Sequence, residues 1–437
     1  MHACPDDVRP AAGPADRGPA PVAGRRRVRE VRPLTAVSLA QIGGGFAGGA
    51  NAAYIVVAAD RLGVSAGSLG WIASAFGFAL VAVALSGRYL LRLGAGRLLQ
   101  VAAGLGVLSA VVMATVPSLP LLVPAAAAGG LSGAGMLLAS VTLLRGAASS
   151  MSLATGFASL ASLVAPVTIG LIELAGYSGG WALLLPVPFL LAAAAAGVRA
   201  DHPDRSVRAA AADRAAGGAP RTADGPVARP EPALARPRWV SVAAAWAAIV
   251  LAVAAEFSFF TWGVARLVDS GLGIGAAAVA GVAFPLGMVV GRFAGARLPD
   301  ASSPVLRGRL RLAAAVTGVA TLAVVAGPWP LVAAGLLVAG LALSTTYPTG
   351  LSLLVRVPGL PLRLATSLGV AASGVAISTA PLALAALAGV TDLRLAFLLP
   401  LPLLALLVVA VHPRWARPSV TVPAPREDRV VTAGAGS

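Results

Sequence analysis

Long apolar runs dominate the chain, and they alternate with short segments that collect its polar and charged residues. Twelve of these runs reach roughly 18 residues, which is long enough for a helix to cross the hydrocarbon of a bilayer. They cover residues 33–59, 69–86, 98–116, 121–144, 153–174, 181–198, 239–264, 276–295, 310–326, 331–355, 365–388 and 395–411. The pattern predicts an all-α integral membrane protein with twelve transmembrane helices.

Composition supports a membrane protein. Of the 437 residues 58% are hydrophobic and only 11% are charged, whereas a soluble globular protein carries about 25% charged residues. All 33 basic residues are arginine, and alanine, glycine and proline are abundant. This usage is typical of a bacterium with a G+C-rich genome, so we expect a protein of the bacterial inner membrane.

The arginines are distributed unevenly between the two sides of the predicted membrane. If the spans alternate from a cytoplasmic start, 30 arginines face the cytoplasm and only Arg61, Arg266 and Arg394 face outward. The positive-inside bias therefore predicts a multi-pass plasma-membrane protein with both termini in the cytoplasm. The arginine-rich segments are short loops or Ala/Pro-rich tails rather than a basic folded domain, so we expect no nucleic-acid partner.

Few residues in the chain could support catalysis or bind a metal. Cys4 is the only cysteine, so no intramolecular disulfide and no cysteine-based metal site is expected. His2, His202 and His412 fall in the tails or the central polar segment. No phosphate-binding loop, Ser/His dyad or paired acids occur within the spans. We therefore expect neither an enzyme nor a bound cofactor or metal.

A polar segment between the sixth and seventh spans divides the chain into two parts. It lacks hydrophobic periodicity and is rich in Ala, Pro and charge, which predicts a disordered cytoplasmic linker. The predicted organisation is a disordered N-terminal tail at 1–33, a six-helix bundle at 34–198, the linker at 199–238, a second six-helix bundle at 239–411 and a C-terminal tail at 412–437.

The two predicted bundles repeat each other in sequence. Positions 210 apart pair Gly63 with Gly273, Gly77 with Gly287 and Gly130 with Gly340. At an offset of 214, Pro186 and Pro188 align with Pro400 and Pro402. Spaced prolines at a nearly constant offset indicate duplication, so we expect two pseudo-symmetric six-helix halves in parallel orientation.

The segment SGRYLLRLGAGR between the second and third spans carries Gly87, Arg92, Gly94 and Arg97. Its spacing, G-x-x-x-x-R-x-G-x-x-R, resembles the signature loop of the major facilitator superfamily, although Leu91 stands where that family usually has Asp. The resemblance implies that the glycines allow close helix contact and a tight turn. It also implies that the arginines pair with acids and helix C-terminal ends. GRFAGARLPD, at 291–300, resembles a second, weaker copy in the loop between the eighth and ninth spans.

Further motifs narrow the resemblance within that superfamily. AEFSFFTW at 255–262, GRFAG and GLALSTTYPTGLSLL at 340–354 resemble the sugar-transporting branch that includes fucose permease. That branch has a Glu six residues before a Trp in the seventh span, and a Tyr-Pro followed by Ser-Leu in the tenth. LVAPVTIGL at 163–171 resembles the Gly-Pro motif of drug antiporters, with Ala165 at the glycine position. Export of a drug or natural product is therefore the alternative.

Glu256 is the leading candidate for a functional acid. A charged carboxylate near the centre of a bilayer costs about 3 kcal/mol, so it is protonated or faces a polar cavity. Glu256 lies 17 residues beyond Trp239, about 25 Å along a helix and beyond the midplane on the outer side. Phe259 and Phe260 follow on the same face and would form a site suited to sugars or amphiphiles. The alternative is an acid that bonds a neighbouring helix.

Other polar residues within the spans are candidates for the same cavity. Asn51 and Tyr54 share one face of the first span, and Tyr347 precedes a proline that should interrupt the tenth. Helix-to-helix hydrogen bonding is the alternative role for the first two. Glu173 lies close to the outer end of the fifth span, where reaching the membrane surface is its alternative role.

These features predict a secondary active transporter that moves a small organic solute by alternating access around a central site. Glu256 is the candidate proton carrier, and a sugar or related polar solute is the expected substrate. A drug or natural-product efflux antiporter is the alternative. The expected partners are the solute, protons and the lipid bilayer, and the protein is expected to function as a monomer.

Overall fold

The computed structural model describes residues 23–115, 118–144, 148–200, 238–297 and 301–413, and these segments are predominantly helical. Within them, twelve helical segments are long and apolar enough to cross a membrane, as the hydrophobic pattern predicted. The all-α fold with twelve spans is confirmed.

The first six spans form the first half of the molecule, residues 23–200. Short 3₁₀ segments η1 (Ala66–Leu69), η2 (Leu91–Leu93) and η3 (Gly179–Leu184) precede α2, α3 and α6. The helices are α1 (Ala23–Leu62), α2 (Trp71–Leu90), α3 (Ala95–Thr115), α4 (Leu119–Leu143), α5 (Ala148–Leu174) and α6 (Val187–Ala200).

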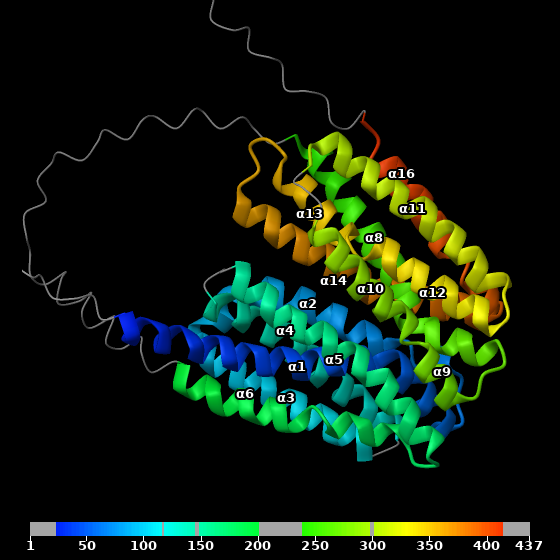
Figure 1. Ribbon diagram of the computed structural model, residues 1–437, viewed down its shortest axis with the longest axis horizontal. Coiled ribbons are helices and arrows are strands. Elements are labelled where there is room, and N and C mark those ends of the chain that lie inside the picture. The colour runs from blue at the N-terminus through cyan, green and yellow to red at the C-terminus, as the bar shows by residue number, and fades with distance from the viewer. Residues whose placement is uncertain (1–22, 116–117, 145–147, 201–237, 298–300, 414–437) are drawn as a thin grey trace, which may run out of the picture.

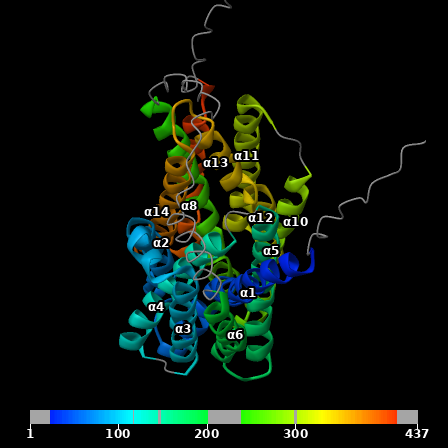
Figure 2. The ribbon, with the colours of Figure 1, turned by 90° about the vertical axis from the view of Figure 1, so that its left-hand side faces the viewer.

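The last six spans form the second half, residues 238–413. Three of them consist of two consecutive helices. The helices are α8 (Trp239–Asp269), α9 (Ile274–Ala280), α10 (Ala283–Ala296), α11 (Ser303–Ala326), α12 (Trp329–Leu343), α13 (Thr346–Val355), α14 (Leu362–Val390), α15 (Leu393–Ala396) and α16 (Pro400–Ala410). The two halves lie one above the other in both ribbon views (Figures 1 and 2).

Prolines explain where spans are interrupted. The tenth span breaks between α12 and α13, and Pro348 lies in the first turn of α13. Proline is tolerated there because the first turn of a helix needs no N–H donor. The sixth and twelfth spans break at equivalent places, just before the prolines that the 214-residue offset aligned. The duplication seen in the sequence therefore reappears as matching breaks.

Glycines let equivalent helices approach closely in each half. An added Cβ at Gly130 of α4 would meet the backbone of Ala75 in α2, and one at Gly340 of α12 would meet the backbone of Phe284 in α10. These glycines lie 210 positions apart and bring together equivalent pairs of spans. Only a residue without a Cβ permits such contact between backbones.

The two halves meet through α2 with α14 and α5 with α9. We call the side on which α1 begins and α16 ends the tail side, and the opposite side the distal side (Figure 1). Gly70, on the distal side, lies against Trp262, and an added Cβ would be 2.8 Å from its ring. Nearer the middle, Gly77 lies against the backbone of Ser378. Close packing therefore seals the halves together on the distal side.

Helix α1 differs from the expected disordered tail at 1–33, because it begins at Ala23. Its first ten residues are mostly arginine, alanine and glutamate, which favour helix, and they extend a helix already formed by the span. Residues 1–22, most of the expected linker at 199–238 and nearly all of the tail at 412–437 lie outside the described residues.

Candidate functional site

A cavity of about 520 Å³ lies between the two halves. The first half contributes residues of all six spans, α1 to α6 with η3, and the second contributes one face of α8 and one face of α10. Its polar lining consists of Gln41, Asn51, Tyr54, Ser109, Ser132, Thr155, Ser159, Ser162, Glu256, Thr261 and Arg292. The cavity is therefore mostly apolar but carries eleven polar side chains, at the interface of the repeats.

The cavity is accessible from the tail side. Arg292 lies four residues before the end of α10 on that side, and its side chain is 52% exposed. Thr155, near the tail-side start of α5, also lines the cavity and is exposed. With the distal side sealed, a solute in the cavity communicates with the tail side in this conformation.

Glu256 lies close to the middle of helix α8, slightly toward its distal end. Helix α8 continues to Asp269, five residues beyond the predicted end of the span, so 17 residues precede Glu256 and 13 follow it. Its side chain is 13% exposed and lines the cavity. The carboxylate faces the cavity, as expected, and its depth just beyond the midplane stays a prediction.

Arg292 lies opposite Glu256. Its Nη2 is 3.9 Å from Glu256 Oε1, and its Nη1 donates to Ser159 Oγ of the first half at 3.5 Å. These are the only ionisable side chains of opposite charge in the described lining of the cavity. Arg292 therefore connects α10 with both α8 and α5 through long contacts.

The sequence had placed Arg292 in a cytoplasmic loop, as part of the second copy of the signature. Helix α10 runs to Ala296, so Arg292 lies within a span, in agreement with the predicted span 276–295 and not with the loop placement. The 210-residue offset between the two halves could have shown that Arg292 precedes the loop. Shifted by 210 positions, Gly87 falls on Arg297, so the equivalent loop begins beyond Arg292. The expected acid of this copy, Asp300, lies outside the described residues.

Asn51 and Tyr54 both line the cavity but differ in their bonding. The Tyr54 hydroxyl donates to the Met113 carbonyl of α3 at 2.8 Å, so this side chain connects two helices of the first half. The amide of Asn51 has no hydrogen-bond partner among the described residues. Asn51 is thus available to a solute, whereas Tyr54 forms part of the wall.

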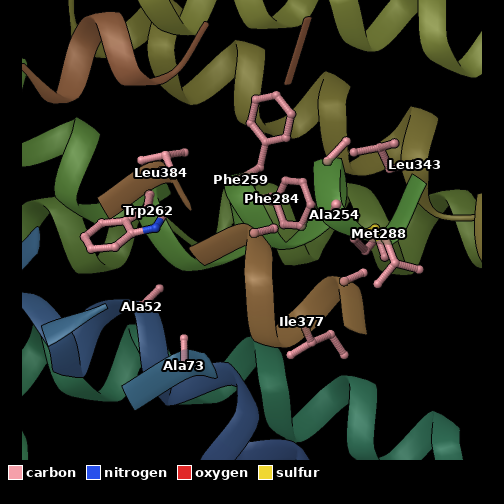
Figure 3. Close-up of a cluster of buried hydrophobic side chains, with 14 of the residues drawn as sticks. Ala52, Ala73, Ala254, Phe259, Trp262, Phe284, Met288, Leu343, Ile377 and Leu384 are labelled. Atoms are coloured by element: carbon pink, nitrogen blue, oxygen red, sulfur yellow. The ribbon is translucent and has the colours of Figure 1, made fainter. Parts of the chain in front are cut away.

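The two phenylalanines after Glu256 take different environments. Phe260 lines the cavity together with Phe257, and their ring centroids are 5.5 Å apart. Phe259 is fully buried in the second half, where it stacks on Phe284 at 6.0 Å and contacts Phe397 (Figure 3). The expectation that Phe259 contributes to the site is therefore not supported, and Phe257 takes its place.

Tyr347 and Glu173 lie apart from the cavity lining. The Tyr347 hydroxyl lies near Ser373 and Gly369 of α14. The Glu173 carboxylate accepts the backbone N–H of Gly179 at 2.6 Å, at the distal end of α5. Both side chains therefore make helix contacts within one half. Among the described residues no three His, Cys, Asp or Glu side chains come together as a metal site.

The segment SGRYLLRLGAGR forms the turn between α2 and α3 on the tail side. Gly94 has a φ of +89°, a conformation that favours glycine. The Arg92 guanidinium lies 5.2 Å from the ring centre of Tyr89, so its described contact is with an aromatic ring rather than an acid. Gly87 lies within α2, and Arg97 is exposed in the first turn of α3.

Comparison with solved structures shows the same architecture at low sequence identity. The nucleoside transporter NupG is 13% identical, with 90% of this chain and 100% of that chain covered and a TM-score of 0.63. A variant of the peptide transporter POT in complex with alafosfalin is 14% identical, with 88% and 94% covered and a TM-score of 0.61. These likenesses establish the fold alone.

Comparison with curated protein sequences finds no match. The sequence does match a family model over residues 37–360, which is most of the chain and extends from α1 of the first half to the end of α13 in the second. The matched region contains the signature turn, the cavity-lining parts of α1 to α5, and the Glu256 and Arg292 pair. This chain, with its twelve spans in two repeated halves around a central cavity, belongs to the Major Facilitator Superfamily of transporters.

Proposed function

We propose that this transporter moves a small organic solute by alternating access, with the cavity between the halves as its site and Glu256 as its proton carrier. The observation that carries the proposal is the pairing of Glu256 with Arg292 inside that cavity. Ionisable groups within a membrane are costly and mark pathways for solutes or protons. The two bundles, 34–198 and 239–411, would rock about this site.

Proton coupling would follow from a change in the environment of Glu256. The carboxylate reaches the cavity, and its one described cation is on a different helix. Movement of α10 relative to α8, or engagement of Arg292 by a solute, would leave the charge without its partner. An unpaired charge at this depth is unfavourable, so Glu256 would then bind a proton.

The expected solute is polar and organic, with a sugar or related compound as the first hypothesis. Uncharged hydrogen-bonding groups in the cavity, including Asn51 and the α5 residues Ser159 and Ser162, support it. Phe257, Phe260 and several methionines also line the cavity, which supports the alternative of a drug or natural product and its export. A functional monomer is proposed because both halves of the site come from one chain.

Orientation is proposed from the arginine distribution. With the tail side in the cytoplasm, fusions of a reporter that is active only in the cytoplasm should be active after Arg97 and at the C-terminus. Fusions at Ser118 should be inactive. The reverse pattern would refute the proposed orientation of the plasma-membrane protein.

The experiment for the transport proposal uses purified protein in liposomes with an imposed proton gradient. A panel of labelled sugars, nucleosides, organic acids and aromatic compounds is screened for accumulation. Glu256→Gln should preserve the fold and exchange but abolish gradient-driven accumulation. Glu173→Gln is the matched control, because it removes another carboxylate within a span without touching the cavity. Equal accumulation by wild type and Glu256→Gln would exclude Glu256 as the carrier.

A further inference from the structure

Arg292 differs from Arg266 and Arg394 in how its guanidinium is bonded. Arg266 donates to Asp269 and to the Val325 carbonyl at 3.1 Å, and Arg394 donates to that carbonyl at 2.7 Å. The contacts of Arg292 are 3.9 Å and 3.5 Å long, beyond the 2.7–3.2 Å of an ordinary N–H···O hydrogen bond. The N–H donors of its planar guanidinium are therefore positioned by these contacts but make no hydrogen bond of ordinary length.

Incomplete hydrogen bonding is unusual for a guanidinium at the position of Arg292. A guanidinium stays charged at all physiological pH values, so it cannot lower the cost of its position by losing a proton. Arg292 lies within a membrane span and yet is 52% exposed, into the cavity. Glu256, its single described carboxylate neighbour, lies on the adjacent helix α8 at a distance of 3.9 Å. The charge is thus kept in the site and left accessible.

From these observations we propose that the transported solute carries a carboxylate, which binds the Arg292 fork and displaces Glu256. The proposal rests on the transport function above and replaces a sugar, its first hypothesis for the solute, with a carboxylate. An arginine binds a carboxylate through two parallel hydrogen bonds, a geometry that neither of its present contacts provides. One arginine in the cavity lining matches one negative charge, whereas a phosphate, with nearly two, would be left incompletely neutralised.

The rest of the solute would be apolar and flat. Beside Arg292, α8 and α10 present Phe257, Phe260 and Met288 to the cavity. Opposite them, α1 presents a face on which Gly48 has open space where a side chain would be. Aromatic rings and thioethers on one side, with a side-chain-free helix surface on the other, suit an aromatic or short alkyl body.

Replacement of Glu256 by the solute carboxylate at Arg292 also leaves the net charge of the cavity unchanged. When the solute carboxylate occupies Arg292, Glu256 is left without a cation and binds a proton. The cavity then holds the solute anion, Arg292 and a neutral Glu256, and its net charge is the same as before binding. One anion and one proton would therefore cross together without net charge movement.

Binding is tested on the purified full-length protein by isothermal titration calorimetry. The probes are benzoate, phenylacetate, 3-phenylpropionate and butyrate, each paired with its uncharged amide. At least one acid should bind, and its amide should bind at least tenfold more weakly. Arg292→Gln should lose tenfold or more in affinity for that acid. Arg297→Gln, which removes the same charge from the end of the same helix, should not.

A second readout distinguishes direct exchange from a structural pair. Titrations in buffers of different ionisation enthalpy should show uptake of about one proton by wild type when the acid binds, because protonation and binding are linked. Glu256→Gln should show no uptake and should bind the acid more tightly, since the competing carboxylate is gone. Equal binding of acids and amides, no binding by any acid, or an unchanged Arg292→Gln would overturn the proposal.

Failure of this proposal is distinguishable from failure of the transport proposal. If a neutral solute accumulates in a Glu256-dependent manner while no acid binds, transport is supported and the carboxylate site is excluded. If an acid binds through Arg292 but crosses no liposome membrane, the carboxylate site is supported and the transport proposal fails.

Discussion

Gly170 and Gly275 lie backbone against backbone where α5 of the first half meets α9 of the second. An added Cβ on Gly170 would be 2.5 Å from the Gly275 carbonyl oxygen, and one on Gly275 would be 2.9 Å from that of Gly170. The contact is reciprocal and lies at the distal end of both helices. Closure of the distal side therefore depends on the absence of two side chains.

A larger residue at this contact should prevent distal closure. We expect Gly170→Val to separate α5 from α9 and to expose the cavity floor at Ala73, which is now 3% exposed. In a Cys4→Ser background, Ala73→Cys should react with an impermeant maleimide added on the distal side only when Gly170→Val is also present. Gly156→Val, on the same helix with open space around it, is the control. Equal labelling in both variants would contradict the prediction.

Access to the cavity from the tail side should be detectable by the same chemistry. Thr155 lines the cavity and is exposed, whereas Ala165, on the same helix, is fully buried. In a Cys4→Ser background, Thr155→Cys should react readily with a maleimide supplied on the tail side, and Ala165→Cys should not. Comparable rates at the two positions would show that the cavity is closed on this side under the conditions of the assay.

Loss of the Trp262 indole N–H should destabilise the second half. This group donates to the Pro381 carbonyl of α14 at 3.2 Å, and the ring is fully buried next to the first-half residue Gly70 (Figure 3). Trp262→Phe should cost about 1 kcal/mol or more, because a buried carbonyl loses its donor. Trp246→Phe removes a similar bond to Leu368 at a half-buried position, so its thermal midpoint should fall less. A larger fall in thermal midpoint for Trp246→Phe than for Trp262→Phe would show that burial does not determine the loss of stability.

The two glycines of the tail-side turn should respond differently to alanine. Gly94 has a φ of +89° and a ψ of 142°, so Gly94→Ala should cost about 1–3 kcal/mol and slow transport. At Gly87 an added Cβ would meet Leu138 at 3.7 Å, which is ordinary contact, so Gly87→Ala should behave like wild type. Thermal midpoints and initial transport rates measure both effects, and a tolerated Gly94→Ala would show that the turn adapts.

The sequence by itself determined the elements of this protein. A bilayer offers no hydrogen-bond partners to the backbone, so each span must be a helix of about 20 apolar residues, and that requirement can be read locally. The glycines at 130 and 340 and the prolines at 186 and 400 identified the repeat, because backbone contact and helix breaks depend on residue type. Glu256 was found because an acid within an apolar span is rare.

The tertiary structure decided which way each side chain faces and where each span ends. Phe259 and Phe260 are adjacent in sequence, yet the rotation of α8 against its neighbours buries the first and opens the second to the cavity. Arg292 resembled a loop residue, and only the packing of α10 beside α8 placed it next to Glu256, 36 positions away in the chain. Helix rotation and span ends are set by packing between distant segments, which local hydrophobicity does not encode.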